Sequence, residues 1–443
     1  METVLLFILG VVVVIVGLAL SIGLHEIGHL VPAKAFGVKV TQYMIGFGPT
    51  VWSRRKGETE YGLKAIPLGG YISMIGMFPP VKAGGAARTA GTGFFNTLVQ
   101  DARSSSAESI GEGEDARAFY RLPVFKRIII MLGGPTMNLL IGIILFAIVL
   151  MGFGTAQPST TVGSVSECVL PATSARQTCD ASDEQAPGAA AGLKPGDRIV
   201  SVDGTPIQTW EQSTAIIRES PGTPLEFVVE RDGEDVNLAI TPKLTERYVV
   251  DEAGAITEDA SGKPVTREVG FVGIGPASEL VQQPAAAVLP AVGDNIVRVG
   301  QMILNLPQRL VEVANAAFGP GERDPNGPIS VVGVGRVAGE ITSIDSVPVA
   351  SKVASLLGLL GSVNIALFVF NLIPLLPLDG GHVAGALWEG IRRFFAKLFK
   401  RPVPGPVDTA KLMPLTFAVV IVLGGMSLLL IYADIVKPIS IFG

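Results

Sequence analysis

The sequence predicts a polytopic α-helical membrane protein with about four transmembrane helices and additional β-structure. Hydrophobic residues make up 48% of the 443 residues and charged residues only 16%, whereas soluble domains carry about 25% charged residues. Four apolar segments, roughly 4–24, 125–153, 352–376 and 413–436, reach the ~20 residues that a helix needs to cross a bilayer. Strand and turn patterns between them predict a mixed α/β composition.

The first apolar segment is expected to remain in the protein as a transmembrane helix. It carries Glu2 where a secretory leader has basic residues, and it shows no convincing small-residue cleavage site. These features argue against a removable signal peptide.

Charge is distributed unevenly along the chain, and its distribution orients the spans. Residues 31–127 hold 13 Lys and Arg against 7 Asp and Glu, residues 375–412 hold 6 against 3, and residues 154–351 hold 13 against 26. Because basic loops remain in the cytoplasm, we expect both termini and the 154–351 region outside. The end of the first helix then lies near the cytoplasmic face.

Cys168 and Cys179 are the only two cysteines, and both fall in the expected external region. An oxidising compartment would allow them to close a short disulfide loop. Two unpaired thiols are the alternative.

Residues 38–77 predict β-hairpins rather than helix. Gly48-Pro49, Lys56-Gly57 and Gly69-Gly70 separate short runs rich in Val, Tyr and Ile. Strand edges cannot face lipid, so such a sheet must line a protein or water-filled cavity.

Residues 79–118 are rich in Gly, Ala and Ser and lack periodicity, which predicts a flexible cytoplasmic loop with no direct role.

The external region contains one compact soluble module. The string PGAAAGLKPGDRIVSVDG is followed by a helical stretch around 210–218 and a second strand, LEFVVERDG. This string closely resembles a PDZ domain, and PDZ domains take an extended peptide as an added strand.

Amphipathic helices are expected on both membrane surfaces. Residues 279–318 repeat apolar side chains at helical spacing, with Pro307 limiting any single helix. Residues 384–400 alternate aromatic and basic faces, which favours an interfacial helix on the cytoplasmic side over a soluble core helix. In chain order we therefore expect a first transmembrane helix (1–36), a membrane-associated β-sheet (37–78), a flexible loop (79–122), a second transmembrane helix (123–153), the PDZ domain (160–245), external strands and surface helices (246–345), a third transmembrane helix (350–383), the interfacial helix (384–410) and a fourth transmembrane helix (411–437).

Two of the three histidines lie in the motif HEIGH, at the end of the first apolar segment. His25 and His29 are four residues apart and share a helix face, so they can coordinate one cation together. Glu26 lies beside them and can act as a general base toward water. A polar patch satisfied by neighbouring spans is the alternative, although ionisable groups at membrane depth are costly and usually functional.

A zinc site needs a third protein ligand, and the candidate is Asp379 in NLIPLLPLDGGH. Asp379 lies at the expected cytoplasmic end of the third span, which is the membrane depth expected for His25 and His29. No Lys or Arg is near it in the sequence, and Gly380 and Gly381 would let the backbone approach a metal closely. A helix cap at the membrane boundary is the alternative for Asp379.

The order of these motifs resembles that of the site-2 proteases. HEIGH, GFGP, IPLGGY, GGPTMN, the PDZ-like string, GPIS and NLIPLLPLDGGH occur as in the bacterial regulator-of-sigma-E-protease type with four spans. The resemblance covers both ends and most of the middle of the chain. The chain differs in having one clear PDZ module where tandem modules are found, and in the insertion at 79–118.

The resemblance implies a role for each site residue. His25, His29 and Asp379 would bind Zn²⁺, Glu26 would be the catalytic acid and base, and Asn371 would contact the substrate backbone. The β-loop residues Gly69, Gly70 and Tyr71 would pair with the substrate as an extended strand. GGPTMN, with Pro135 and Asn138, matches a motif of the second span whose role the sequence does not explain. His382 has no ligand role in this pattern; we expect it to pack against or support the site, with substrate or proton handling as the alternative.

The implied activity is that of an intramembrane zinc metalloendopeptidase in the bacterial cytoplasmic (inner) membrane. Its substrates would be transmembrane segments of single-span membrane proteins, such as anti-sigma factors first cut by an upstream site-1 protease, or signal-peptide remnants. A transmembrane helix hides its carbonyl groups in hydrogen bonds, so the substrate must unwind, and strand addition at the β-loop could replace the lost bonds. We expect contact with membrane lipid and no nucleic-acid partner.

Two other functions fit part of the sequence. A membrane-anchored PDZ scaffold with a non-catalytic metal site would not need Glu26 between two ligands. A zinc transporter would use ligands at the middle of the membrane without a base, and it leaves the β-loop and the PDZ-like module without a role.

Overall fold

The structure is a computed structural model that describes residues 2–79, 94–174, 176, 178–180, 182–249, 256–257, 259, 263–344 and 347–439. The chain forms two compact units, one made of Met1–Phe153 with Pro284–Gly443 and the other of Gly154–Gln283. In the sequence, the second unit is therefore an insertion into the first, between Phe153 and Pro284.

Four helices of the described residues are long and apolar enough to cross a membrane. They are α1 (Glu2–Ala35), α3 (Val124–Ala147) with its π-helical continuation η3 (Ile148–Phe153), α9 (Val349–Asn371) and α11 (Met413–Val436) with the preceding turn η5 (Thr409–Leu412). Large apolar side chains such as Val4, Leu20 and Val422 stay exposed on them, while polar Ser21 and Asn364 are buried and joined by a 3.0 Å hydrogen bond. This inverted distribution is that of a protein whose outer surface meets lipid.

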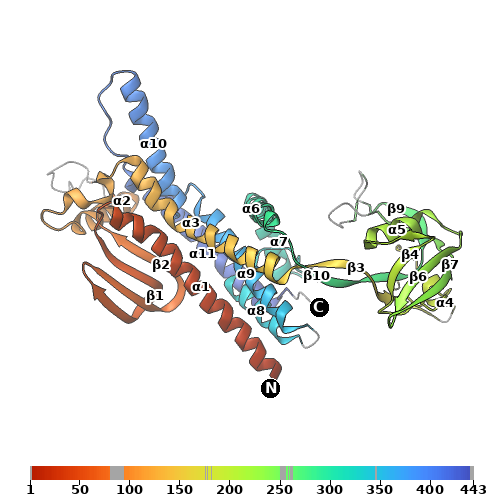
Figure 1. The fold of residues 1–443 in the computed structure, drawn as a ribbon. Coiled ribbons are helices and arrows are strands. Elements are labelled where there is room, and N and C mark those ends of the chain that lie inside the picture. The colour runs from red at the N-terminus through yellow and green to blue at the C-terminus, as the bar shows by residue number, and fades with distance from the viewer. Residues whose placement is uncertain are drawn as a thin grey trace. The chain divides into compact units, whose positions relative to one another are not determined.

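Helix α1 packs against α3 and α8 (Val331–Ser343), and α3 packs against α9 and α10 (Asp379–Leu398) (Figure 1). Small residues allow these close approaches. A Cβ on Gly133 of α3 would lie 1.9 Å from the carbonyl oxygen of Gly28 on α1, and one on Gly10 would lie 2.4 Å from that of Ala338 on α8. Such contacts between small residues let helix backbones meet directly.

Strands β1 (Val40–Lys56) and β2 (Thr59–Met74) form an antiparallel sheet beside α1. Residues 42–45 pair with 70–73 on one side and with 60–63 on the other, while 52–56 pair with 59–63. Each strand is therefore bent midway. Gly46, Gly48 and Gly69 have φ angles of 94°, 86° and 104° near the bends, values that side chains rarely tolerate. Of the three expected turns, Lys56-Gly57 is the hairpin turn and the other two are bends.

The segment expected to be a flexible loop, 79–122, contains regular structure in its described part. Helix α2 (Phe94–Glu108) is followed by the short turns η1 (Asp115–Arg117) and η2 (Phe119–Arg121). Arg103 of α2 forms an ion pair with Asp408 before α11, and Ser106 Oγ accepts a 2.9 Å hydrogen bond from the Phe78 amide. The expectation of an unstructured loop is wrong for 94–121, because partners distant in sequence order it; the expectation for 80–93 lies outside the described residues.

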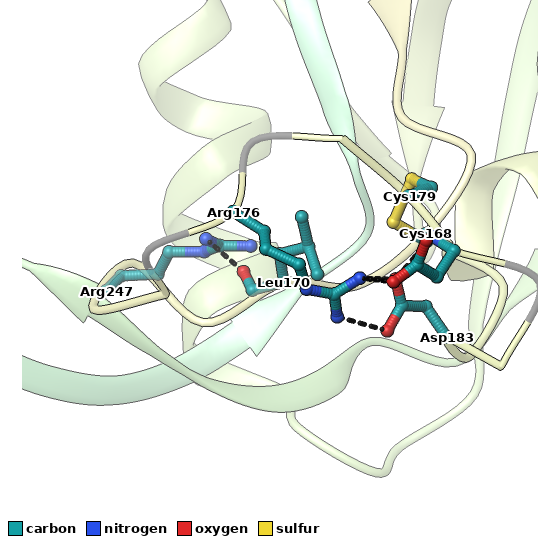
Figure 2. The surroundings of a disulfide bond; sticks show 7 residues. Cys168, Leu170, Arg176, Cys179, Asp183 and Arg247 are labelled. Carbon is teal, nitrogen blue, oxygen red and sulfur yellow. Dashed lines mark hydrogen bonds and ion pairs between the residues drawn. A yellow bond between two sulfur atoms is a disulfide. The ribbon is translucent and has the colours of Figure 1, made fainter.

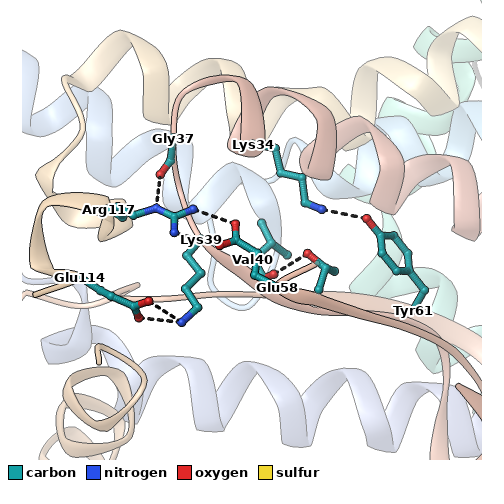
Figure 3. Close-up of polar contacts among 9 residues, drawn as sticks. Lys34, Gly37, Lys39, Val40, Glu58, Tyr61, Glu114 and Arg117 are labelled. Carbon is teal, nitrogen blue, oxygen red and sulfur yellow. Dashed lines mark hydrogen bonds and ion pairs between the residues drawn. The ribbon is translucent and has the colours of Figure 1, made fainter. Parts of the chain in front are cut away.

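The end of the same segment is also attached to the β1–β2 sheet. The Lys39 ammonium lies 2.6 Å from Glu114 Oε1, and the Arg117 guanidinium binds Glu58 at 2.7 Å as well as the Gly37 carbonyl at 3.1 Å (Figure 3). Arg117 lowers the pKa of the Glu58 carboxyl below its ordinary value. These pairs connect residues 114–117 to the start of β1 and to the hairpin turn.

The third span is shorter than expected, because α9 ends at Asn371 and Asp379 begins a separate helix, α10 (Asp379–Leu398). Pro374 and Pro377 lie between the two helices and supply no backbone donor. The turn is held by hydrogen bonds between residues two or three positions apart. The Leu375 amide donates to the Ile373 carbonyl at 2.7 Å, and the Gly381 amide donates to the Leu378 carbonyl at 3.0 Å. Hydropathy did not reveal the break because the turn itself is apolar.

The helices that follow the second unit are η4 (Ala285–Ala287), α6 (Val288–Leu304) and α7 (Leu306–Phe318). Pro307 stands in the first turn of α7, so it separates two helices as the sequence predicts. Exposed apolar side chains on both, including Leu289, Val297, Leu304 and Phe318, match the expected amphipathic character.

The second unit is a mixed α/β module with strands in the order β10-β3-β4-β6-β7, in which β5 also pairs with β4, and with a separate β8–β9 hairpin. The strands are β3 (Thr155–Val165), β4 (Arg198–Val202), β5 (Thr205–Pro206), β6 (Leu225–Arg231), β7 (Glu234–Ile240), β8 (Lys243–Tyr248), β9 (Thr266–Phe271) and β10 (Ile274–Val281), with helices α4 (Pro187–Ala190) and α5 (Trp210–Glu219). Its core contains Val162, Ile199, Phe227 and Val229, which are fully buried.

Cys168 and Cys179 form a disulfide, one of the two alternatives that the sequence left open (Figure 2). The Arg176 guanidinium inside the closed loop donates to Asp183 at 2.9 Å, and Arg247 of β8 donates to the Leu170 carbonyl at 2.9 Å. The same Arg247 guanidinium lies 3.7 Å from the centre of the Phe271 ring. The disulfide loop is thus fastened to the β8–β9 hairpin.

Candidate metal centre

His25 and His29 lie one turn apart on α1, and their Nε2 atoms are 3.2 Å from each other. Asp379, at the start of α10, brings its Oδ2 atom to 3.3 Å from each of these nitrogens. No other group of three potential ligands of this kind occurs among the described residues. The structure therefore brings together the three candidate ligands predicted from the sequence, two from near the N-terminus and one from the C-terminal part of the chain.

The spacing of these three atoms fits a tetrahedral metal. Ligands at 2.0–2.1 Å from zinc occupy corners about 3.3–3.4 Å apart, which is the separation observed. Within the described residues Asp379 Oδ2 is buried and makes no hydrogen bond, so it is free to bind a cation. Two imidazoles and one carboxylate also form the donor set of catalytic zinc sites, in which a fourth position stays open.

The backbone of α3 orients one of the imidazoles. His29 Nδ1 lies 2.7 Å from the Ile130 carbonyl oxygen, so Nδ1 carries the proton and Nε2 is left with its lone pair toward Asp379 and His25. His25 Nδ1 is buried and has no partner among the described residues.

The motif GGPTMN, whose role the sequence left open, packs against this centre. A Cβ on Gly134 would lie 2.2 Å from His29 Nε2 and 2.7 Å from His25 Nε2. Gly133 meets the backbone of Gly28 in the same crossing, and Asn138 is buried one turn further along α3. The absence of a side chain at Gly134 therefore makes space for the two imidazoles. The spacing of residues within one helix cannot reveal this contact between two helices.

Glu26 is buried beside the donor triad, and the edge of the β1–β2 sheet touches it. A Cβ on Gly70 would lie 3.0 Å from Glu26 Cγ. In the described part of the chain, residues 70–73 pair only with 42–45, so they form an edge strand next to Glu26.

A cavity of about 290 Å³ lies beside the donor triad, between α1, the β1–β2 sheet and the start of α10. Its walls include His25, Glu26, His29, Gly70, Tyr71, Asn371, Asp379 and His382. Gly69 does not line it; that residue lies at the bend of β2, where a Cβ would be 2.3 Å from the Phe47 ring. Met74, Met77 and Met131, which the sequence did not single out, complete an apolar part of the wall.

Membrane-length helices around a His-His-Asp triad, with a glutamate at its side, define a class of metal-dependent hydrolases held in a membrane. Comparison with known proteins agrees. The sequence model of peptidase family M50 matches residues 13–407 of this chain. Zinc metalloprotease Rip1 of Mycobacterium tuberculosis is 33% identical over 99% of this chain and 100% of its own length. Metalloprotease MmpA of Caulobacter vibrioides is 30% identical over 88% of this chain and 86% of its own.

The chain belongs to peptidase family M50. It is a zinc metalloprotease with Zn²⁺ as cofactor, and its four apolar helices are those of a multi-pass membrane protein.

Proposed function

We propose that this protein is an intramembrane protease that cleaves transmembrane segments of single-span membrane proteins. The observation that carries this proposal is the position of the triad. His25 and His29 belong to a helix long enough to span a bilayer, and Asp379 follows the end of another. A hydrolytic centre built from such helices meets a peptide bond that lies at membrane depth.

In this proposal His25, His29 and Asp379 hold the zinc ion. Bound there, zinc would supply a positive charge that polarises the scissile carbonyl group and water. Glu26 takes a proton from the attacking water and delivers it to the amide nitrogen as the carbon–nitrogen bond breaks. Burial of Glu26 and its contact with Gly70 keep the carboxylate at the cavity wall where the substrate would lie.

The substrate binds in extended form along residues 70–73. Their free edge supplies backbone donors and acceptors in place of the helical hydrogen bonds that the substrate loses on unwinding. Asn371 also lines the cavity, and its side-chain amide would offer a donor and an acceptor to the substrate backbone. Substrates with helix-weakening residues are therefore preferred.

We further infer that the second unit is a PDZ domain outside the cytoplasm. Its helix α4 followed by the strand β4 carries the PDZ-like string, and its five-strand order with a flanking helix α5 supports that assignment. It would act as a size filter or as a reader of a newly exposed chain end. By its resemblance to site-2 proteases the protein acts in the bacterial inner membrane, on anti-sigma factors after a site-1 protease or on signal-peptide remnants.

The decisive experiment compares Glu26→Gln with Asp379→Asn in purified protein and a single-span substrate. Glu26→Gln removes the base but no ligand, so zinc per protein should stay at the wild-type level while cleavage falls at least ~100-fold. Asp379→Asn should lose most of the zinc. Normal turnover by Glu26→Gln would refute the role of Glu26 in the protease mechanism, and absence of cleavage by the wild type would favour the scaffold. Unchanged zinc in Asp379→Asn would refute the ligand set.

A further inference from the structure

His382 is the third histidine of the chain, and the mechanism above gives it no task. It lies one turn after Asp379 on α10 and lines the same cavity. It does not belong to the donor triad. In the described part of the chain its imidazole forms no hydrogen bond, so a ring N–H remains available to a ligand in the cavity.

The start of α10 is held rigidly, which fixes where this imidazole lies. A Cβ on Gly380 would lie 2.3 Å from the Ile373 carbonyl oxygen, and one on Gly381 would lie 2.6 Å from the Leu376 amide nitrogen. The turn 372–378 therefore closes directly onto the first turn of α10. Asp379 and His382 lie on this same first turn of α10, so their positions relative to each other are fixed together.

Beside the charge that zinc would supply, a hydrogen-bond donor aimed at the carbonyl oxygen would speed the hydrolysis of an amide, and the other side chains of the cavity do not supply one. As water adds, the carbonyl oxygen becomes negative, and a donor fixed in place beforehand lowers the barrier. Glu26 is an acceptor, and the Tyr71 hydroxyl already donates to Gln42 Oε1 at 3.3 Å. Asn371 is assigned to the substrate backbone. The unpartnered His25 Nδ1 is buried and belongs to a proposed metal ligand, so among the described polar side chains that line the cavity His382 is the donor without another task.

We propose that His382 is a second catalytic residue, whose imidazole N–H donates a hydrogen bond to the scissile carbonyl oxygen while the tetrahedral carbon forms. The inference rests on the proposed protease function. In this step the water oxygen bonds to the carbonyl carbon and the carbon–nitrogen bond then breaks. The proton removed by Glu26 ends on the amide nitrogen, and His382 keeps its own proton throughout.

The test compares His382→Ala, His382→Gln and the exposed α10 control Arg392→Gln. For His382→Ala we expect kcat to fall about 100-fold or more, as for removal of one oxyanion donor, with KM and zinc per protein within about twofold of wild type. His382→Gln retains an N–H donor and should recover at least ~10-fold of the loss. Arg392→Gln should match the wild type.

A binding measurement separates catalysis from folding. A phosphinic peptide, whose tetrahedral centre mimics the hydrated carbonyl, should bind His382→Ala more weakly by a factor similar to the loss in kcat. In a Glu26→Gln background, which allows intact substrate to be titrated, the affinity for that substrate should stay within about twofold.

Three results would overturn the role of His382: an unchanged kcat in His382→Ala, an equal loss of substrate and phosphinate affinity, or a loss of zinc. Failure of the proposed function has a different signature, because wild-type protein would then lack cleavage, or Glu26→Gln would retain it.

Discussion

Gly134 is where α3 crosses the two imidazoles of α1. A single added methyl group would lie 2.2 Å from His29 Nε2 and 2.7 Å from His25 Nε2, distances that require the rings or the helix to move. Gly134→Ala should therefore displace the proposed ligands and lower zinc affinity about 10–100-fold, the range known for residues that support metal ligands.

The measurement is zinc per protein across a chelator titration. Gly424→Ala is the matched control, because Gly424 lies in the apolar helix α11 and no atom of the described residues lies within 4 Å of its Cβ position. Equal zinc affinity in the two variants would show that the α3 crossing does not constrain the imidazoles.

Some site residues could be predicted from the sequence and others could not. His25 and His29 share a helix face by their spacing alone, and an acid beside an apolar run needs a cation, which identifies Asp379. Gly134 acts through contact with a helix more than 100 residues away, and the Ile130 carbonyl orients His29 through its backbone. Neither relation leaves a local pattern.

The buried pair Arg127–Glu389 connects α3 to α10, the helix that carries Asp379. The Glu389 side chain is fully buried, 2.6 Å from the Arg127 guanidinium and 2.7 Å from Arg393, and it accepts a 3.0 Å hydrogen bond from the Val407 amide. Glu389→Ala leaves the Arg127 charge buried without its partner, which costs about 3–5 kcal/mol.

Thermal unfolding in detergent checks this expectation. Glu389→Ala should melt well below the wild type, and Arg392→Gln, an exposed charge on the same helix, should not. A double variant, Arg127→Met with Glu389→Leu, removes both charges and should recover much of the loss. Equal melting of Glu389→Ala and the wild type would mean that the pair does not secure α10.

In the second unit, Asp197 gives stability a defined pH dependence. Both of its oxygens accept 2.7 Å hydrogen bonds from Arg231, which lowers the Asp197 pKa below its ordinary value. The pair thus stabilises the folded unit above pH ~4, and this contribution is lost as the pH falls through the lowered folded pKa. The protection factors of the amides 198–231 in the full chain should fall in acid, and Asp197→Asn should show low protection factors already at pH 7. Identical profiles would contradict this.

Element boundaries were predictable where composition changes and not where contacts decide. Pro307 separates α6 from α7 as its ring demands. The break after Asn371 occurs inside an uninterrupted apolar run, so hydropathy extended the third span to 383. Helix α2 has a polar sequence, and its partners Phe78 and Asp408 lie elsewhere in the chain.

The whole molecule must place its connections on defined sides of the membrane. One membrane-length helix, α3 with η3, separates the connection 36–123 from the region 154–283, so a single crossing puts these two stretches on opposite sides. From the excess of Lys and Arg in 31–127 and of Asp and Glu in 154–351, we predict that the former lies in the cytoplasm.

Single introduced cysteines test this orientation in a Cys168→Ser/Cys179→Ser background, which removes the native thiols. Glu234→Cys at the start of β7 and Glu112→Cys after α2 both replace exposed side chains. A membrane-impermeant maleimide should label position 234 in intact cells and position 112 only after permeabilisation, because the reagent cannot cross the bilayer. The reverse pattern would invert the topology, and labelling of both positions in intact cells would mean that α3 does not cross the membrane.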